Sequence, residues 1–193
     1  VRGLEIPQLV APEQTEARDT LPSFHFQPTS TAGETPAPHV VGFMARDYGA
    51  ATPGRLIASA KSWLCHTGVD RTAELLPWHA AADVERISPV EASSRYLAHL
   101  RTAWNNKFKS EPLERQDAVL TLPASFDEIA RELTIEAAAE AGLPRVVLIE
   151  EPQAAFYAWI YKHQNNWDQL VLPGQKILVC DIGRSEEHTS ELQ

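Results

Sequence analysis

The sequence predicts an α/β fold in which helices cover a sheet of short apolar strands. The main observation is the order strand, helix, strand, helix, strand between residues 118 and 182. The three strands are runs of apolar residues, which is typical of strands buried on both faces. A composition of 44% apolar and 22% charged residues is that of an ordinary globular protein. The 193 residues suffice for one domain or for part of a larger one.

The first elements have weaker patterns. Strands are predicted at Leu21–Phe26 and at Val40–Ala45, and the stretch between them, Gln27–His39, is a loop rich in Pro, Thr, Ala and Gly. Thr52 and Pro53 form an N-cap followed by a first-turn proline, so a helix is predicted after them. Its apolar face would carry Leu56, Ile57, Ala60, Trp63 and Leu64.

The middle of the chain contains one well-marked helix. His66–Ile87 has no period and is predicted to be irregular. Ser88-Pro89-Val90-Glu91 is a capping box with proline in the first turn, which predicts that a helix begins here. Its inward positions are predicted to be Val90, Leu97, Leu100 and Trp104.

The second half is more regular. Ala118–Leu122 and Val146–Ile149 are predicted strands, and the helix between them is capped by Ser125 and stopped by Gly142. The apolar stripe of that helix is Phe126, Ile129, Leu133, Ala137 and Ala141.

The last elements follow the second of these strands. Pro152 opens a helix, Gln153–Tyr161, that is apolar nearly all round and is therefore predicted to be buried. A polar connection, His163–Gln175, leads to the third strand, Lys176–Ile182.

Charge and cysteine content exclude several classes of protein. A net charge of −9 argues against a nucleic-acid-binding surface. Cys65 and Cys180 have no metal-ligand spacing and indicate a reducing compartment rather than a disulfide framework. No apolar run reaches membrane-spanning length, and Val1–Val10 does not have the pattern of a signal peptide. A cytoplasmic protein without a membrane partner is expected.

The strand ends indicate where ligands would bind, because open α/β sheets bind them beyond the carboxyl ends of the strands. The three ends are Leu122-Pro123, Glu150-Glu151-Pro152 and Asp181-Ile182-Gly183. Carboxylates beside a glycine suit hydrated Mg²⁺ and phosphate groups. Taken singly, the same residues also serve as helix caps and turn formers, so only their coincidence favours a site.

Three ordered motifs at these ends resemble the seventy-kilodalton heat-shock (DnaK-type) chaperone family. A-V-L-T-L-P-A-S-F-D-E-I-A-R at Ala118–Arg131 is similar to that family's strand, V-P-A-Y-F turn and Arg-bearing helix. A-A-A-E-A-G-L-P-R-V-V-L-I-E-E-P-Q-A-A at Ala137–Ala155 is similar to its A-G-L and N-E-P-T-A-A signature. I-L-V-C-D-I-G at Ile177–Gly183 resembles the start of its D-L-G-G-G-T phosphate loop. Leu21–Ser23 and Ser59–Leu64 correspond more weakly.

The resemblance implies a partial actin-like ATPase (ribonuclease H-like) lobe, with a mixed sheet and covering helices, that uses ATP and Mg²⁺. It makes Lys61 and Glu151 catalytic, Lys61 at the γ-phosphate and Glu151 near the attacking water and the metal shell. The resemblance implies that Asp181 organises Mg²⁺ and that Asp181 and Gly183 bind the nucleotide. Pro123 and Arg131 match the pair that relays nucleotide state to a peptide-binding domain, a role we weigh equally against a strand terminator and a surface ion pair.

The resemblance also implies partners: unfolded polypeptide clients, J-domain co-chaperones and nucleotide exchange factors. Two alternatives remain open. One is another enzyme on the actin-like fold, such as a sugar kinase; the other is a nucleotide-dependent binding module that does not hydrolyse ATP. The second is favoured by departures from the family around Lys61 and by Glu150 and Gln153, which stand where the family has Asn and Thr.

The chain is expected to be a piece of a longer protein. Residues 1–23 and 88–183 are predicted to form the core of the first lobe, and residues 24–87 an inserted upper subdomain. Arg184–Gln193 matches the translation of a common sequencing-library adapter and is expected to be an artefact. The piece alone is expected to be inactive as an ATPase, because neither the first phosphate loop nor the opposing lobe is in the sequence.

Overall fold

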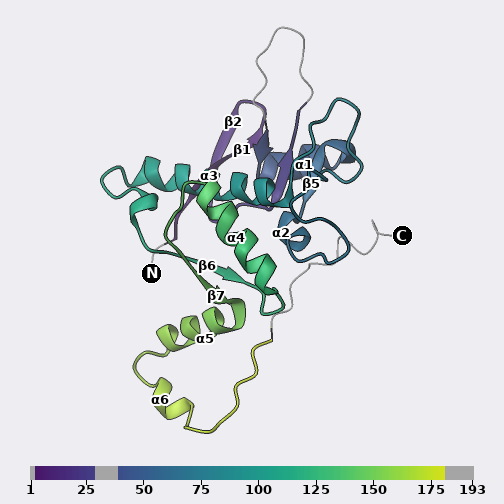
Figure 1. Cartoon of the computed structure of the whole chain (residues 1–193). Coiled ribbons are helices and arrows are strands. Elements are labelled where there is room, and N and C mark those ends of the chain that lie inside the picture. Colours follow the sequence, from purple (N-terminus) through teal and green to yellow (C-terminus); the bar gives the residue numbers. More distant parts are fainter. Residues whose placement is uncertain (1–2, 29–38, 181–193) are drawn as a thin grey trace.

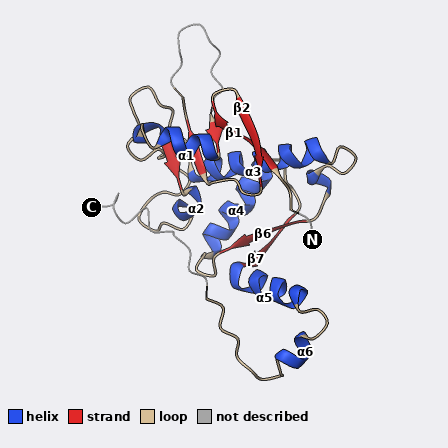
Figure 2. Cartoon of the chain, turned by 180° about the vertical axis from the view of Figure 1, so that it is seen from behind, coloured by secondary structure: helices blue, strands red, loops and turns tan. Residues whose placement is uncertain are grey.

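The computed structural model describes residues 3–28 and 39–180 (Figure 1). It is a mixed α/β protein with three small sheets, of two, three and two strands. Two of the sheets lie on one side of the long helix α3 (Pro89–Lys107), and the third lies with helix α5 (Glu151–Lys162) at the opposite end (Figures 1 and 2). Both views show α5 projecting beyond the body that α3 and α4 (Glu128–Glu140) form.

The amino-terminal part consists of antiparallel strands and one short helix. Strands β1 (Ile6–Ala11) and β2 (Gln14–Arg18) form a hairpin, which was not predicted. The second sheet has the order β4 (Val40–Val41), β3 (Phe24–Phe26), β5 (Leu56–Ala58).

The strand predicted at Val40–Ala45 is too long. It ends at Val41, because Gly42 adopts a positive φ of 91° and helix α1 (Phe43–Gly49) begins directly after it.

The helix predicted after Thr52 and Pro53 is wrong. The chain instead forms a 3₁₀ turn, η1 (Pro53–Arg55), then strand β5, then the short helix α2 (Ala60–Trp63). Pairing with β3 provides hydrogen-bond partners for the backbone of β5, and this tertiary contact overrides the local helical pattern. Most of the predicted apolar set is nevertheless buried: Ile57, Ala60, Trp63 and Leu64.

Helix α3 begins as the capping box predicts. The Ser88 hydroxyl accepts a hydrogen bond of 3.0 Å from the backbone N–H of Glu91, and Pro89 occupies the first turn. Of the inward positions predicted, Val90 is buried, whereas Leu97, Leu100 and Trp104 are only half-buried. The preceding segment, residues 66–87, contains no helix or strand, as predicted, apart from one isolated bridge to its last residue.

Two apolar clusters form the core, one on each side of α3. The first contains Ile57, Ala60, Trp63, Leu75, Leu76, Ile87 and Ala92. The second contains Leu64, Val90, Leu122, Phe126, Ala130, Leu133 and Ala137. Because the segment 56–64 supplies residues to both, α2 is held firmly between them.

The strand–helix–strand unit in the second half is confirmed. Strands β6 (Ala118–Leu122) and β7 (Val146–Glu150) pair in parallel, with Leu122 opposite Glu150, and α4 (Glu128–Glu140) connects them. The short turn η2 (Leu113–Arg115) precedes β6. Gly142, at a φ of 79°, follows the end of α4 as predicted.

Two details of α4 differ from the prediction. Asp127, rather than Ser125, caps the helix, since its carboxylate accepts from the backbone N–H of Ala130 at 2.8 Å. Ile129 is 57% exposed, and Ala130 takes its place on the buried face.

Helix α5 (Glu151–Lys162) forms where it was predicted, but its predicted burial is wrong: none of its residues is buried. Val119 and Val147, on the neighbouring strands, are also more than half exposed. In the described part of the chain, Val171 and the irregular residues 177–179 line a pocket with α5 but do not bury it. A short helix, α6 (Trp167–Leu170), follows in the connection predicted to be polar loop.

The third strand predicted, Lys176–Ile182, is not formed in its described part. Residues 176–180 are irregular, and Leu178 is 86% exposed. A strand requires a neighbouring strand to satisfy its backbone groups, and the pair β6–β7 has no third member among the described residues. Asp181 and Gly183 lie outside the described residues, as does Arg184–Gln193.

Candidate functional site

The two residues predicted to be catalytic meet in the structure. Lys61 lies in α2 and Glu151 is the first residue of α5, 90 positions later in the chain. The Lys61 Nζ donates to the Glu151 Oε1 at 2.5 Å. The side chains keep 49% and 30% of their surface exposed, so both remain accessible to a ligand.

Local backbone conformation determines the positions of the Lys61 and Glu151 side chains. Ser59, at a φ of 51°, turns the chain sharply from β5 into α2, and the buried Ala60 and Trp63 fix that helix against the core. On the other side, Glu150 is extended and Glu151 begins the helix, with Pro152 in its first turn. The β7–α5 junction therefore presents two successive carboxylates at the carboxyl end of a parallel strand.

The carboxylate of Glu150 forms an ion pair with Arg131. Arg131 Nη2, from α4, donates to the Glu150 Oε1 at 2.8 Å, and Arg131 Nε donates to the Phe126 carbonyl at 3.3 Å. The Phe126 N–H in turn donates to the Pro123 carbonyl at 3.1 Å. The predicted relay residues Pro123 and Arg131 are thus connected through Phe126. Arg131 in turn contacts Glu150, the residue that precedes Glu151.

Sequence reasoning missed the part played by Glu150. It treated this residue only as a departure from the Asn of the family, whereas the structure pairs it with Arg131. No sequence pattern shows that α4 returns to this strand end. Only the parallel β6–β7 pairing brings the two residues together.

The described side chains provide one of the ligands that a hydrated magnesium ion would need. Glu151 offers a partly exposed carboxylate, the kind of ligand that holds Mg²⁺ directly or through water. Among residues 3–28 and 39–180, no group of three or more His, Cys, Asp or Glu is arranged to hold a metal. Asp181, the predicted metal residue, is outside those ranges.

A small pocket adjoins Lys61. Its volume is about 170 Å³, and its walls come from α2, α3, β6 and α4, including Tyr96 and Leu122. Pockets for drug-sized ligands and cofactors usually hold ~300 Å³ or more. The described residues therefore supply the Lys61–Glu151 pair but do not by themselves enclose a nucleotide.

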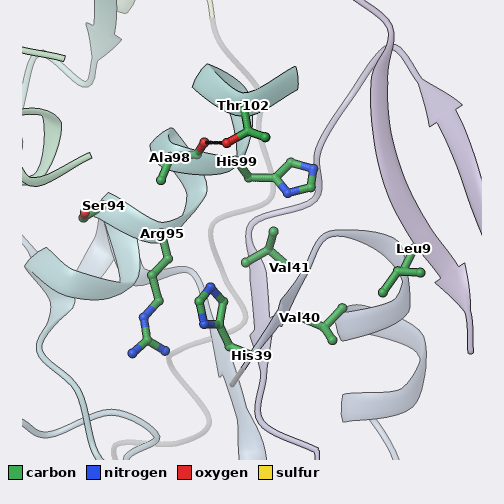
Figure 3. Close-up of a pocket in the computed structure, with 9 residues that line it drawn as sticks. All are labelled: Leu9, His39, Val40, Val41, Ser94, Arg95, Ala98, His99 and Thr102. Carbon is green, nitrogen blue, oxygen red and sulfur yellow. Dashed lines mark hydrogen bonds between the residues drawn. The ribbon is translucent and has the colours of Figure 1, made fainter. Parts of the chain in front are cut away.

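A second, larger pocket was not predicted from the sequence. It has a volume of about 360 Å³ and lies between β1, β4 and α3 (Figure 3). Beside it, the buried His25 accepts a hydrogen bond from Arg95 at 2.7 Å. Burial, together with the positive charges of Arg95 and His39, lowers the pKa of His25 to about 3.

Comparison with known proteins identifies the family. The sequence profile of the family described as "Hsp70 protein" matches residues 46–193, which is most of the chain. The chain belongs to the Hsp70 family. The matched range includes Lys61, Pro123, Arg131 and Glu151.

Individual relatives are consistent with this. The chain is 29% identical over 162 residues to "Heat shock 70 kDa protein BIP3" of Oryza sativa subsp. japonica. The aligned region covers 75% of this chain and 23% of that protein. It is 36% identical over 129 residues to a "Chaperone protein HscA homolog" of Methylibium petroleiphilum, covering 62% and 20%. It is 32% identical over 154 residues to "Chaperone protein HscA" of Salmonella paratyphi C, covering 75% and 24%. The chain spans about a quarter or less of the length of these curated relatives.

In the part of the chain that the structure describes, no helix has both the length and the apolar character needed to cross a bilayer.

Proposed function

We propose that this chain forms part of the ATP-binding and ATP-hydrolysing domain of an Hsp70-type chaperone, an actin-like lobe that couples hydrolysis to the binding and release of unfolded polypeptides. The observation that carries the proposal is the 2.5 Å contact between Lys61 and Glu151, brought together across 90 positions of sequence. Two charged residues singled out by family motifs meet at the carboxyl end of a parallel strand, where ligands of α/β sheets bind.

The two residues have complementary roles in this proposal. Phosphoryl transfer needs positioning and charge stabilisation more than covalent chemistry from the protein. Lys61 carries a compact positive charge on a flexible stem, which suits the γ-phosphate. Glu151 is a carboxylate held in place by Lys61, and it orients the attacking water and accepts a hydrogen bond from it. When the phosphate binds, Lys61 exchanges part of its contact with Glu151 for the phosphate oxygens.

The remaining site residues follow from the family motifs. Asp181 would hold Mg²⁺ through water, and Gly183 would allow the backbone to approach the phosphates. When bound, Mg²⁺ supplies positive charge at the phosphate oxygens. Pro123 and Arg131 would carry the nucleotide state outward, and the contacts through Phe126 and Glu150 give that relay a physical path.

The proposal extends to the whole protein. Residues 1–23 and 88–183 would belong to the core of the lobe and residues 24–87 to an inserted subdomain. J-domain co-chaperones, exchange factors and unfolded clients would be its partners in the cytoplasm. The exposed apolar surface of α5 and β6–β7 is consistent with a lobe that continues beyond the described residues.

One observation favours a second candidate, a module that binds nucleotide without hydrolysing it. Glu150 stands where the family has Asn and places a second carboxylate next to Glu151, which alters the charge around the group that would orient the attacking water. The ion pair with Arg131 offsets this charge, and for that reason we favour hydrolysis.

Single-turnover hydrolysis of ATP by the full-length protein tests the proposal. Glu151→Gln keeps the size of the side chain and removes the charge that orients the water. We expect the rate of hydrolysis to fall ~100-fold or more while ATP still binds. Glu16→Gln is the matched control, because Glu16 forms an ion pair of the same 2.5 Å length on β2. Binding without hydrolysis in the unchanged protein would support the second candidate, and hydrolysis only with sugar would support a kinase.

A further inference from the structure

The pocket between β1, β4 and α3 is lined by both basic and apolar side chains. Arg95 and His39 lie side by side in it, with His99 on the next turn of α3 (Figure 3). Leu9, Val40 and Ala98 contribute apolar surface. No acidic side chain is among the nine residues that line it, and neither is Lys61 or Glu151. The pocket is therefore distinct from the proposed ATP site.

Arg95 is held in place by neighbours outside the pocket. Its Nη2 donates to the Glu91 Oε1 at 2.6 Å, and its Nη1 lies 2.7 Å from the His25 Nε2. These contacts use two of the five N–H groups of a guanidinium, which leaves three for a ligand. The Arg95 side chain is only 18% exposed, so an anion bound there would be largely shielded from water.

Two buried ring nitrogens beside Arg95 have no hydrogen-bond partner among the described residues. They are the Nδ1 atoms of His25 and of His39, whose rings stack 5.0 Å apart. Because His25 accepts from Arg95 at Nε2, its neutral ring carries the proton on Nδ1 and can only donate there. Unpartnered buried polar atoms are rare in folded proteins, and of these two only the Nδ1 of His39 belongs to a residue that lines the pocket.

We propose that this pocket binds a small monocarboxylate, with the carboxylate at Arg95 and His39 and the apolar part of the ligand against Leu9, Val40 and Ala98. A guanidinium matches the planar geometry of a carboxylate and can donate two parallel hydrogen bonds to it. The volume of about 360 Å³ accommodates an aliphatic or aromatic acid of a few carbon atoms beyond the carboxylate.

The charges argue against other ligands. The positive charge of Arg95 repels a metal cation, and Glu91, which balances it, is not part of the pocket wall. Inorganic phosphate would contact the basic side chains of the pocket but leave its apolar side chains in contact with water. A neutral amide would forgo the ion pair with Arg95 and the two parallel hydrogen bonds that both oxygens of a carboxylate accept from a guanidinium.

The histidines make the binding dependent on pH. Burial and the charge of Arg95 lower the pKa of His39 in the free protein, although Glu91 partly opposes this and His99 adds to it. A carboxylate against His39 favours the protonated ring. Binding is therefore coupled to proton uptake, and affinity rises as the pH falls from 8 to 6.

Calorimetric titration of the nucleotide-free full-length protein with benzoate tests the proposal. At pH 6, we expect benzoate to bind at least ~10-fold more tightly than benzamide, the neutral analogue, and than phosphate. Arg95→Met is expected to raise the Kd for benzoate ~10-fold or more, and His39→Gln to raise it less. Arg101→Met, on the same helix but outside the pocket, is the control and should leave the Kd unchanged.

Three outcomes would overturn the proposal. They are no heat of benzoate binding at pH 6, equal affinity for benzoate and benzamide, and binding that survives both Arg95→Met and His39→Gln within twofold. Because Arg95 also contacts His25 and Glu91, its variant is checked by thermal unfolding. The His39 Nδ1 has no hydrogen-bond partner among the described residues, and the ring stacks on that of His25, so His39→Gln tests the site even if Arg95→Met does not fold.

Discussion

Replacing Lys61 by Met separates a catalytic lysine from a structural one. Met keeps most of the length of the side chain and removes its charge, so packing against α2 changes little. The change breaks the 2.5 Å contact with Glu151. In the proposed function it also removes the positive charge that the γ-phosphate requires.

The expected losses of stability and of hydrolysis rate differ in size. Both side chains of the Lys61–Glu151 pair are partly exposed, at 49% and 30%. Such a pair contributes ~0.2–1 kcal/mol to the free energy of unfolding. The loss of a charge that stabilises a transition state costs ~2.7–4 kcal/mol, or about 100- to 1,000-fold in rate. Stability should therefore change little while the rate of hydrolysis falls by about two to three orders of magnitude.

Single-turnover ATP hydrolysis and thermal unfolding, measured on the same full-length preparations, compare the two effects. Arg18→Met is the matched control, because Arg18 and Glu16 also lie 2.5 Å apart, with 48% and 40% exposure. The control should lose a similar small amount of stability and no activity. A Lys61→Met protein that hydrolyses ATP within threefold of the unchanged protein would refute a catalytic role for this residue.

Three further outcomes are expected. Ser88→Ala should lower the free energy of unfolding by ~1 kcal/mol, measured in urea, because the cap of α3 is lost; an unchanged midpoint would contradict the assignment of the cap. Gly142→Ala should cost ~1–2 kcal/mol in the same assay, because the residue has a φ of 79°, and a neutral result would argue against this turn. His25 has a pKa lowered to about 3, so below pH 6.5 the unfolded chain takes up a proton that the folded chain does not; stability should fall by about 2 kcal/mol between pH 7 and pH 5. His25→Gln should remove most of this dependence, and equal slopes for the two proteins would contradict the lowered pKa.

Local signals in the sequence sufficed for the elements that begin and end with strong caps. The capping box before α3 and the strands β6 and β7 lie where they were predicted, within one residue. In these segments propensity, capping and packing all favour the same structure. The helix predicted after Pro53 was wrong because β5 pairs with β3, whose residues lie 30 to 34 positions earlier, and no local pattern contains that pairing.

The prediction that α5 is buried failed for a different reason. Its composition indicates a buried helix, but burial requires covering elements, and among the described residues the irregular segment 171–179 that lies against α5 leaves it exposed. Motif reasoning singled out Lys61, Glu151, Pro123 and Arg131; the structure brings Lys61 and Glu151 into contact, and the roles assigned to all four stay predictions. Motif reasoning missed that Arg131 neutralises Glu150 and that α3 forms a basic pocket with β4, because both depend on how distant segments pack.

The structure of the full-length protein with Mg²⁺ and a non-hydrolysable ATP analogue would test the central claim most directly. The account predicts that the γ-phosphate lies about 3 Å from the Lys61 Nζ and that Glu151 contacts the attacking water or the metal shell. It also predicts that Asp181 and Gly183 face the same cleft. A nucleotide bound elsewhere, with the Lys61–Glu151 contact intact and remote from every phosphate, would contradict it.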